Sequence, residues 1–296
     1  MSKVSVLLHP TTPTRAVYRH KRTLRWKTWA RVTLSSIMTV VLLIPFFWLI
    51  TIALKSEPEL AELPIHIFPQ QLEWENFVKA LTLIDYLHYT ENTLILSGTY
   101  AVLTTLTCAM VGFAFARLRG RGKRFWFLLM LSTIMMPPII TLIPTYIIYT
   151  RLNLLGTYWP WVLSGLGSSP FLSFLFRQFF ASIPQELEEA AIVDGCNYWL
   201  MFWRIFLPIS RPALATSLLL SFAAVWGDYI TPSLLLNSDN TTLAVAMSGS
   251  YVNEQGLALI NISAAGVIMY IVPVLLLFFF VQRYFVRGIV TTGLKG

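Results

Sequence analysis

The amino-acid sequence predicts an all-α polytopic membrane protein with six transmembrane helices. Apolar residues make up 56% of the 296 residues and charged residues only 12%, a balance that would leave a soluble protein of this size insoluble. Six charge-poor runs approach or exceed the roughly 20 apolar residues that a span needs. They are residues 32–54, 92–116, 125–150, 152–176, 212–236 and 255–282.

The distribution of basic residues predicts the orientation of these spans. If the amino terminus lies inside, the outer segments hold only Lys55, Lys79 and Arg151 of the 22 Lys and Arg residues. Because Lys and Arg concentrate in short cytoplasmic loops, we expect both termini to be cytoplasmic. The net charge of +8 is then a topology signal, and no nucleic-acid partner is needed to explain it.

Three regions follow from this reading. Residues 1–30 form a basic cytoplasmic tail, whose first two dozen residues we expect to be disordered. Residues 31–288 form the six-span domain, and residues 289–296 form a cytoplasmic C-terminal tail. The run 32–54 is too long for a signal-peptide core and lacks an A-x-A-like site, so we expect an uncleaved span.

The outer segment from Lys55 to Glu91 is the longest between two spans. Trp74, Phe77, Val78 and Leu81 follow helical spacing, which predicts a short amphipathic helix. A solvated loop with one interfacial helix and a docking surface for an extracytoplasmic partner both fit it. The same holds for the polar outer loop 237–254.

Small residues in the second span are typical of a close helix contact. The neighbouring helix could belong to this chain or to another subunit. The residues are Gly98, Thr104, Thr105, Ala109 and Gly112. The two cysteines, Cys108 and Cys196, are predicted to be packing residues without a disulfide.

A polar helical hairpin is predicted for residues 182–212, between the fourth and fifth runs. Ser182 and Gln185 have the spacing of a capping box, and Gly195 suits a left-handed position after the first helix. Asn197 can cap a second short helix. Pro208 and Pro212 are expected to end that helix and to open the next span.

Several function classes are disfavoured by what the sequence lacks. No G-x-x-x-x-G-K-[ST] segment is present, so we expect no ATP bound through a P-loop of this chain. The histidines lie apart from metal-ligand spacing, which predicts no bound metal or other cofactor; they are His9, His20, His66 and His88. Asp228 is the one clear carboxylate within a span, which leaves little for a proton or sodium pathway.

The hairpin resembles the EAA motif of the membrane subunits of bacterial ABC importers. The matching residues are Glu189-Ala190-Ala191, Asp194-Gly195, Phe202, Ile205, Leu207-Pro208 and Pro212. Three further segments resemble the carbohydrate-importer branch, which includes the smaller maltose-type permease subunit. They are Phe115 to Leu118, Met136 to Pro144 and Gln282 to Gly288.

Two departures from that family stand out. Cys196 occupies a position where alanine is usual, a change between small residues. The run Trp226-Gly227-Asp228-Tyr229 replaces the more frequent Trp-Asn-acid-aromatic order, which weakens any assignment of the sugar.

The resemblance implies a type I ABC importer permease fold in a bacterial inner membrane and a cytoplasmic coupling helix. The implied partners are a second homologous permease, two ATPase subunits that bind ATP and Mg²⁺, and an extracytoplasmic solute-binding protein. The residues implied in ATPase docking are Glu189, Ala190, Ala191, Asp194, Gly195, Leu207 and Pro208.

A path for a mono- or oligosaccharide is predicted at Trp226, Asp228 and Tyr229, because aromatic faces and carboxylates suit sugar rings and hydroxyls. An outer aromatic belt is the alternative for the two aromatic residues. Import of polyamines or another small polar solute, and ion-coupled secondary transport, remain alternative functions.

Overall fold

The computed structural model describes residues 16–64 and 66–292, and within them the chain is helical. The long helices are α1 (Ala16–Ala53), α4 (Tyr86–Arg117), α12 (Arg211–Trp226) and α15 (Ile260–Thr292). The short helices before the hairpin are α2 (Glu57–Ala61), α3 (Glu75–Thr82), α5 (Lys123–Ser132), α6 (Pro138–Arg151), α7 (Trp159–Leu166) and α8 (Pro170–Ala181). Among these described residues, β structure is limited to one isolated bridge between Val252 and Ala258.

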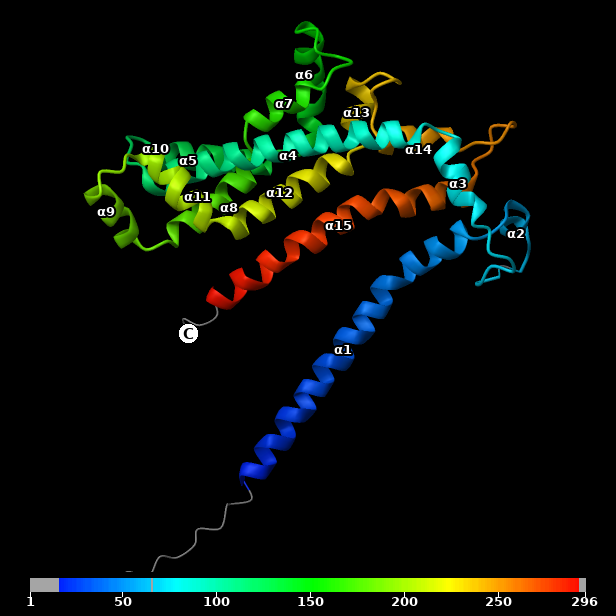
Figure 1. The fold of residues 1–296 in the computed structure, drawn as a ribbon, viewed down its shortest axis with the longest axis horizontal. Helices are drawn as coiled ribbons and strands as arrows, with labels where there is room; N and C mark the ends of the chain where they lie inside the picture. Colours follow the sequence, from blue (N-terminus) through cyan, green and yellow to red (C-terminus); the bar gives the residue numbers. More distant parts are fainter. Residues whose placement is uncertain (1–15, 65, 293–296) are drawn as a thin grey trace, which may run out of the picture.

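The helices α4, α8, α12 and α15 lie side by side and form the body of the molecule (Figure 1). α4 is central, since it packs against α7, α8 and α12, and α12 packs in turn against α15. α1 meets α15 near its own C-terminal end and then diverges from the bundle (Figure 1). The fold is therefore a compact helical body with one outlying helix.

The number of possible spans is smaller than the sequence suggests. Three helices are long and apolar enough to cross a membrane, namely Thr28–Ala53, Tyr86–Arg117 and Ile260–Tyr284. Two bent pairs raise the number to five among the described residues: Lys123–Met135 with Pro138–Arg151, bent by 100°, and Tyr198–Ile209 with Arg211–Trp226, bent by 81°. Six spans therefore remain a prediction.

The fourth predicted span, residues 152–176, is divided into α7 and α8. The break falls at Gly167–Ser169, where Ser168 has a φ of 61°. Pro170 then starts α8, as the fixed φ of proline permits in a first helical turn. Hydropathy cannot detect such a break, because the intervening residues are small and uncharged.

The N-terminal tail is more helical than the sequence predicts. α1 begins at Ala16, so the expectation of disorder is wrong for residues 16–24, and residues 1–15 lie outside the described part. α15 runs to Thr292, past the predicted start of the C-terminal tail at residue 289. Runs of Arg and Lys are good helix formers, and a helix once nucleated propagates at low cost.

The small residues of the second span serve a contact within this chain. A Cβ atom on Gly112 would lie 2.5 Å from the Cβ of Phe176 on α8, and Thr105 Oγ1 lies 3.0 Å from Ser217 Oγ on α12. Both free cysteines are packing residues, as predicted. Gly98 differs, since a Cβ there would meet nothing within 4 Å.

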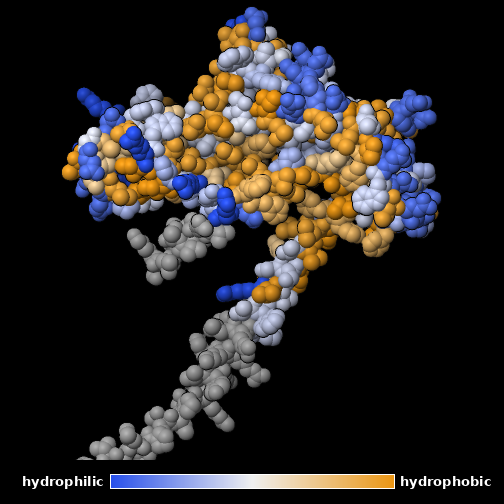
Figure 2. All heavy atoms as spheres, in the orientation of Figure 1, coloured by the Kyte–Doolittle hydropathy of each residue, from blue (hydrophilic) through white to orange (hydrophobic). Residues whose placement is uncertain are grey.

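The short helix predicted around residues 74–81 is confirmed as α3, while its outer location stays a prediction. It is tied to the end of α1 because the Asn76 Nδ2 group donates to the carbonyls of Ala53 and Lys55, at 2.9 and 2.8 Å. Trp74 and Val78 are exposed. Figure 2 shows hydrophilic residues gathered over the α2 and α3 end, with hydrophobic surface over the middle of the body.

We expect Gly112→Ala to destabilise the protein by about 1–3 kcal/mol, because the new methyl group would overlap the Cβ of Phe176 in a tightly packed contact. The free energy of unfolding of the detergent-purified chain measures this effect. Gly98→Ala is the matched control on the same helix, where a Cβ would meet nothing within 4 Å, and should be neutral or slightly stabilising. Equal stability of the two variants would contradict the close α4–α8 contact.

Candidate functional site

The candidate site is the hairpin between α8 and α12, at the end of the body opposite α2 and α3 (Figure 1). Its elements are α9 (Gln185–Val193), α10 (Tyr198–Met201), the π-helical turn η2 (Phe202–Phe206) and α11 (Leu207–Ile209). α9 stands away from the body, whereas α10 and η2 return to it (Figure 1). The hairpin thus has an outer arm and a root.

The corner between the two arms has the predicted geometry. Gly195 has a φ of +76°. Its N–H donates to the Ile192 carbonyl at 3.0 Å, while the Cys196 N–H donates to the Ala191 carbonyl at 2.9 Å. This pair of bonds is a Schellman motif, which satisfies the last carbonyls of a helix and needs a left-handed residue. The sequence therefore fixes the angle at which α9 ends.

The second arm begins as predicted and the first does not. The Asn197 side chain accepts a hydrogen bond from the Leu200 N–H at 2.8 Å, which confirms the cap. Ser182 is not an N-cap, because α9 starts at Gln185 after Pro184, and the Ser182 hydroxyl donates instead to the Phe179 carbonyl at 2.7 Å. Ser182 is too far from the start of α9 to accept its first N–H groups.

Pro208 does not end the second arm, contrary to the prediction. The chain stays helical to Ile209 because a π-turn precedes the proline, in which the Leu207 N–H donates to the Phe202 carbonyl. A proline ring clashes with the carbonyl four residues earlier, and a wider turn gives that carbonyl room. Pro212 does open α12, as predicted.

The outer arm leaves an accessible surface around the corner. Glu189, Ala190, Asp194 and Gly195 are exposed. Three apolar neighbours share this exposure, namely Leu187, Ile192 and Val193. An exposed mixture of carboxylates and apolar side chains is typical of a surface that another protein covers.

Ala191 lies on the side of α9 that packs against the body. It is 5% exposed and belongs to this chain's own core cluster. Its small side chain therefore allows α9 to approach the body, whereas the resemblance implies a part for Ala191 in ATPase docking. Leu207 is half-buried and Pro208 is exposed at the root.

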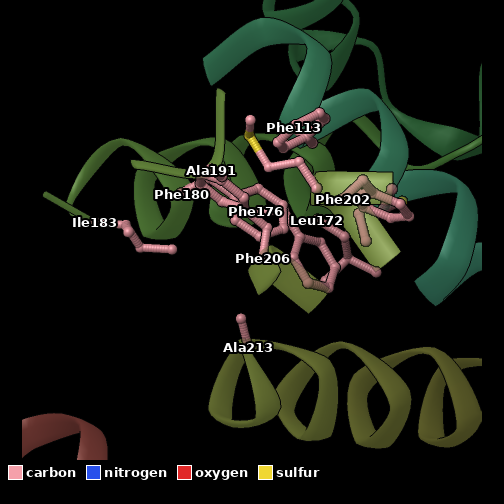
Figure 3. Close-up of a cluster of buried hydrophobic side chains, with 12 residues drawn as sticks. Phe113, Leu172, Phe176, Phe180, Ile183, Ala191, Phe202, Phe206 and Ala213 are labelled. Carbon is pink, nitrogen blue, oxygen red and sulfur yellow. The ribbon is translucent and has the colours of Figure 1, made fainter. Parts of the chain in front are cut away.

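The root is held by a cluster of phenylalanines from three elements (Figure 3). Phe113 of α4 is the centre, with ring centroids 5.0 Å from Phe206 and 5.4 Å from Phe202 of η2. Phe180 of α8 lies 5.8 Å from Phe206. Offset and edge-to-face pairs of this kind stabilise beyond their area of burial, so the root is firmly packed onto the body.

Arg117, the last residue of α4, connects the outer arm to the same cluster. Its Nη1 lies 3.2 Å from the Glu188 Oε2 of α9, and the two side chains are only 9% and 12% exposed. Its Nη2 donates to the carbonyls of Phe180, at 2.6 Å, and Ile183. The guanidinium carbon also lies 5.1 Å from the Phe206 ring centroid.

Sequence analysis did not assign Arg117 and Glu188 to the site. Arg117 was counted as one of many basic residues beside a span. The two residues are 71 positions apart, and no periodicity links them. A possible signal was the place of Glu188 directly before the Glu189-Ala190-Ala191 run.

Two recesses adjoin the hairpin. A polar recess of about 280 Å³ is lined by Ala116, Arg117, Arg119, Gln185, Glu188, Glu189, Ile192 and Tyr198. An apolar groove of about 180 Å³ is lined by Met110, Phe113, Ala114, Leu118, Tyr198, Trp199 and Phe202. Tyr198 lines both recesses, so polar and apolar surfaces are continuous here. No group of three or more potential metal ligands occurs among the described residues.

The three residues of the predicted solute path do not lie together on one surface. Trp226 is 2% exposed and stacks between Phe222 and Tyr270, with centroids 5.4 Å away in each case. Asp228 accepts a hydrogen bond from the Thr231 N–H at 3.2 Å, beside the start of α13 (Ile230–Leu235). Tyr229 is 48% exposed. Asp228 and Tyr229 are accessible at the break between α12 and α13.

The helical body and the candidate spans are typical of a membrane protein. The chain belongs to the family described as the binding-protein-dependent transport system inner membrane component, which it matches over residues 108–291. This membership identifies it as a permease subunit of an ABC importer.

Relatives and a solved structure agree with this assignment. The chain is 32% identical over 259 residues to a probable ABC transporter permease protein of Bacillus subtilis, which covers 85% of this chain and 83% of the relative. It is 34% identical to the arabinooligosaccharides transport system permease protein of Halalkalibacterium halodurans, over 77% of this chain and 81% of the relative. The fold matches a bacterial ABC transporter involved in import of the acidic polysaccharide alginate, with a TM-score of 0.76 and 23% identity over 89% and 98% of the two chains.

We expect Glu188→Ala to lower the free energy of local opening of α9 by about 2–3 kcal/mol, because the buried Arg117 charge loses its counter-ion. Hydrogen exchange of the α9 amides measures this opening. Glu189→Ala is the control, since Glu189 is exposed on the same helix and forms none of the described ion pairs. Unchanged exchange in Glu188→Ala would show that the ion pair does not hold the arm.

Proposed function

We propose that this chain is the transmembrane permease of a bacterial ABC importer for a mono- or oligosaccharide, and that its hairpin docks on a separate ATPase. The observation that carries the proposal is the hairpin itself. Its corner is fixed by Gly195, its outer arm exposes Glu189 and Ala190, and its root is locked into the body through Arg117 and the phenylalanine cluster. An exposed arm on a rigid root is suited to receive force.

Force on the arm would be transmitted as a rigid-body movement. A force on α9 would act on α4 through the Glu188–Arg117 pair. Arg117 would pass it to the end of α8 through its hydrogen bonds to the carbonyls of Phe180 and Ile183. Packed helices respond to such a push by switching between discrete arrangements. The partner ATPase would bind ATP and Mg²⁺ and supply the energy, with no cofactor bound by this chain.

The remaining expectations of topology and assembly form part of the same proposal. The chain would cross the inner membrane six times, with both termini and the hairpin in the cytoplasm. A second permease would cover apolar surface of the body that this chain leaves exposed. A solute-binding protein would dock at the opposite end, where α2 and α3 lie (Figure 2).

A sugar is the favoured solute because the relatives with similar sequences are named for oligosaccharides. Asp228 and Tyr229 are the residues we propose to face its path, because they combine a carboxylate and an aromatic ring at a helix break. Trp226 would act indirectly, by holding α12 against α15 through its Nε1 bond to the Tyr270 carbonyl at 3.1 Å.

Two alternatives are separated by uptake measurements in cells that lack this chain. We expect loss of uptake of a labelled oligosaccharide, restoration by the wild-type chain, and no inhibition by a protonophore while cellular ATP is maintained. Loss of polyamine uptake alone would favour the polyamine importer that the run Gly227 to Pro232 suggests. Inhibition by the protonophore at constant ATP would favour an ion-coupled carrier.

We expect Gly195→Val to uncouple ATP hydrolysis from transport in the assembled importer. A Cβ at this position would meet nothing within 4 Å, so the penalty is a backbone strain of about 1–2 kcal/mol at positive φ, which would turn the arm. Gly195→Asn is the control, because asparagine tolerates this conformation.

The measurement is the ratio of solute imported to ATP hydrolysed in reconstituted vesicles. Normal coupling in Gly195→Val would remove the hairpin from the mechanism. Equal uncoupling in both variants would assign the effect to bulk on the docking surface instead of to the corner angle.

A further inference from the structure

A second feature of the hairpin end is a group of basic residues that form none of the contacts described above for the outer arm α9. Arg121 lies in the connection from α4 to α5, and Lys123 and Arg124 are the first two residues of α5. No acidic residue lies between Arg117 and Arg177 in the sequence. Arg177 of α8 faces the same region, because its guanidinium carbon lies 4.2 Å from the ring centroid of Phe127 on α5. We call these four residues the basic corner.

No residue of the basic corner forms an ion pair within the described chain. The two ion pairs among the described residues are Lys79 with Glu75 and Arg117 with Glu188. Glu188 lines the adjoining polar recess and interacts electrostatically with Lys123, but its carboxylate is already paired with Arg117. Four cations that outnumber the nearby acid create a positive potential that attracts an anion.

Two of the four cations are held in place by uncharged groups. The Lys123 Nζ donates to the carbonyl of Leu118 at 2.7 Å and to that of Ala116 at 3.5 Å. Arg177 uses the face of its guanidinium on Phe127, which leaves its in-plane N–H groups as donors. Arg121 and Arg124 are exposed. The site thus combines two cations that contact uncharged groups of the chain with two exposed ones.

The surroundings indicate a lipid as the source of the anion. α5 has no buried residue, and Phe125 and Trp126 beside the basic corner are 63% and 58% exposed. Trp at the polar end of an apolar helix marks the level of lipid headgroups, and basic residues at that level attract anionic lipids. These exposed aromatic rings would contact the apolar part of a lipid, whereas they would add nothing to the binding of a soluble anion.

We propose that Arg121, Lys123, Arg124 and Arg177 bind the phosphate of an anionic phospholipid of the phosphatidylglycerol class. Its acyl chains would lie along the exposed apolar side of α5. The site is separate from the ATPase-docking arm and would fix the start of α5 at the membrane surface.

Native mass spectrometry of the whole importer in mild detergent tests the proposal, with phosphatidylglycerol and phosphatidylcholine offered in equal amounts. The wild type should retain phosphatidylglycerol preferentially. Arg124→Gln should weaken this retention about fivefold, and the double variant Arg124→Gln with Arg177→Gln more strongly. Arg151→Gln is the matched control, an exposed arginine at the far end of α6, and should leave retention unchanged.

Arg124→Gln keeps the test decisive if Arg177→Gln perturbs packing, because the Arg124 side chain is exposed. Equal retention of the two lipids by the wild type would overturn the proposal, as would an equal loss in Arg151→Gln. Complete displacement of the lipid by inorganic phosphate would assign the site to a soluble anion. Loss of the ATPase from Arg124→Gln with unchanged lipid retention would assign it to a subunit contact.

Discussion

The hairpin end of this protein depends on the burial of one guanidinium group. An arginine at the end of an apolar helix is costly to bury unless its donors are paired. Both terminal nitrogens of Arg117 are paired, whereas its buried Nε has no partner among the described residues. It meets the Glu188 carboxylate of α9, two carbonyls at the end of α8, and the Phe206 ring of η2. α4 and three successive segments of the later chain, namely α8, α9 and η2, are thereby held around a single charge. None of them can shift without leaving that charge less satisfied.

The Arg117 contacts can act on the whole body only because the neighbouring helices α4, α8 and α12 are closely packed. Gly112 lets α4 meet the backbone of α8 at Phe176, and the Thr105–Ser217 contact joins α4 to α12. Small residues permit such closeness where lipid supplies no hydrophobic force between helices. We therefore expect a displacement that enters at α9 to reach the middle of the body as a movement of whole helices, because close-packed interiors do not deform gradually.

Local chemistry was predictable from the sequence and tertiary pairing was not. Gly195 and Asn197 were assigned correctly because a left-handed turn and an N-cap each depend on a few adjacent residues. Ser182 was misassigned because its spacing to Gln185 fits a capping box, while Pro184 delays the helix start. The Arg117–Glu188 pair and the burial of Trp226 depend on which helices become neighbours, and hydropathy carries no information on that choice.

Helix breaks give the remaining clue to where a solute could pass. Backbone groups freed within a membrane must be satisfied by protein or face a water-filled cavity. Beyond α13 the chain satisfies them itself, since the Gly156 N–H donates to the Leu235 carbonyl at 2.7 Å. Between α12 and α13, the Asp228 carboxylate accepts the Thr231 N–H and remains only half-buried, beside exposed Gly227 and Tyr229. A break that keeps a carboxylate accessible is better suited to line a polar path than to pack against lipid.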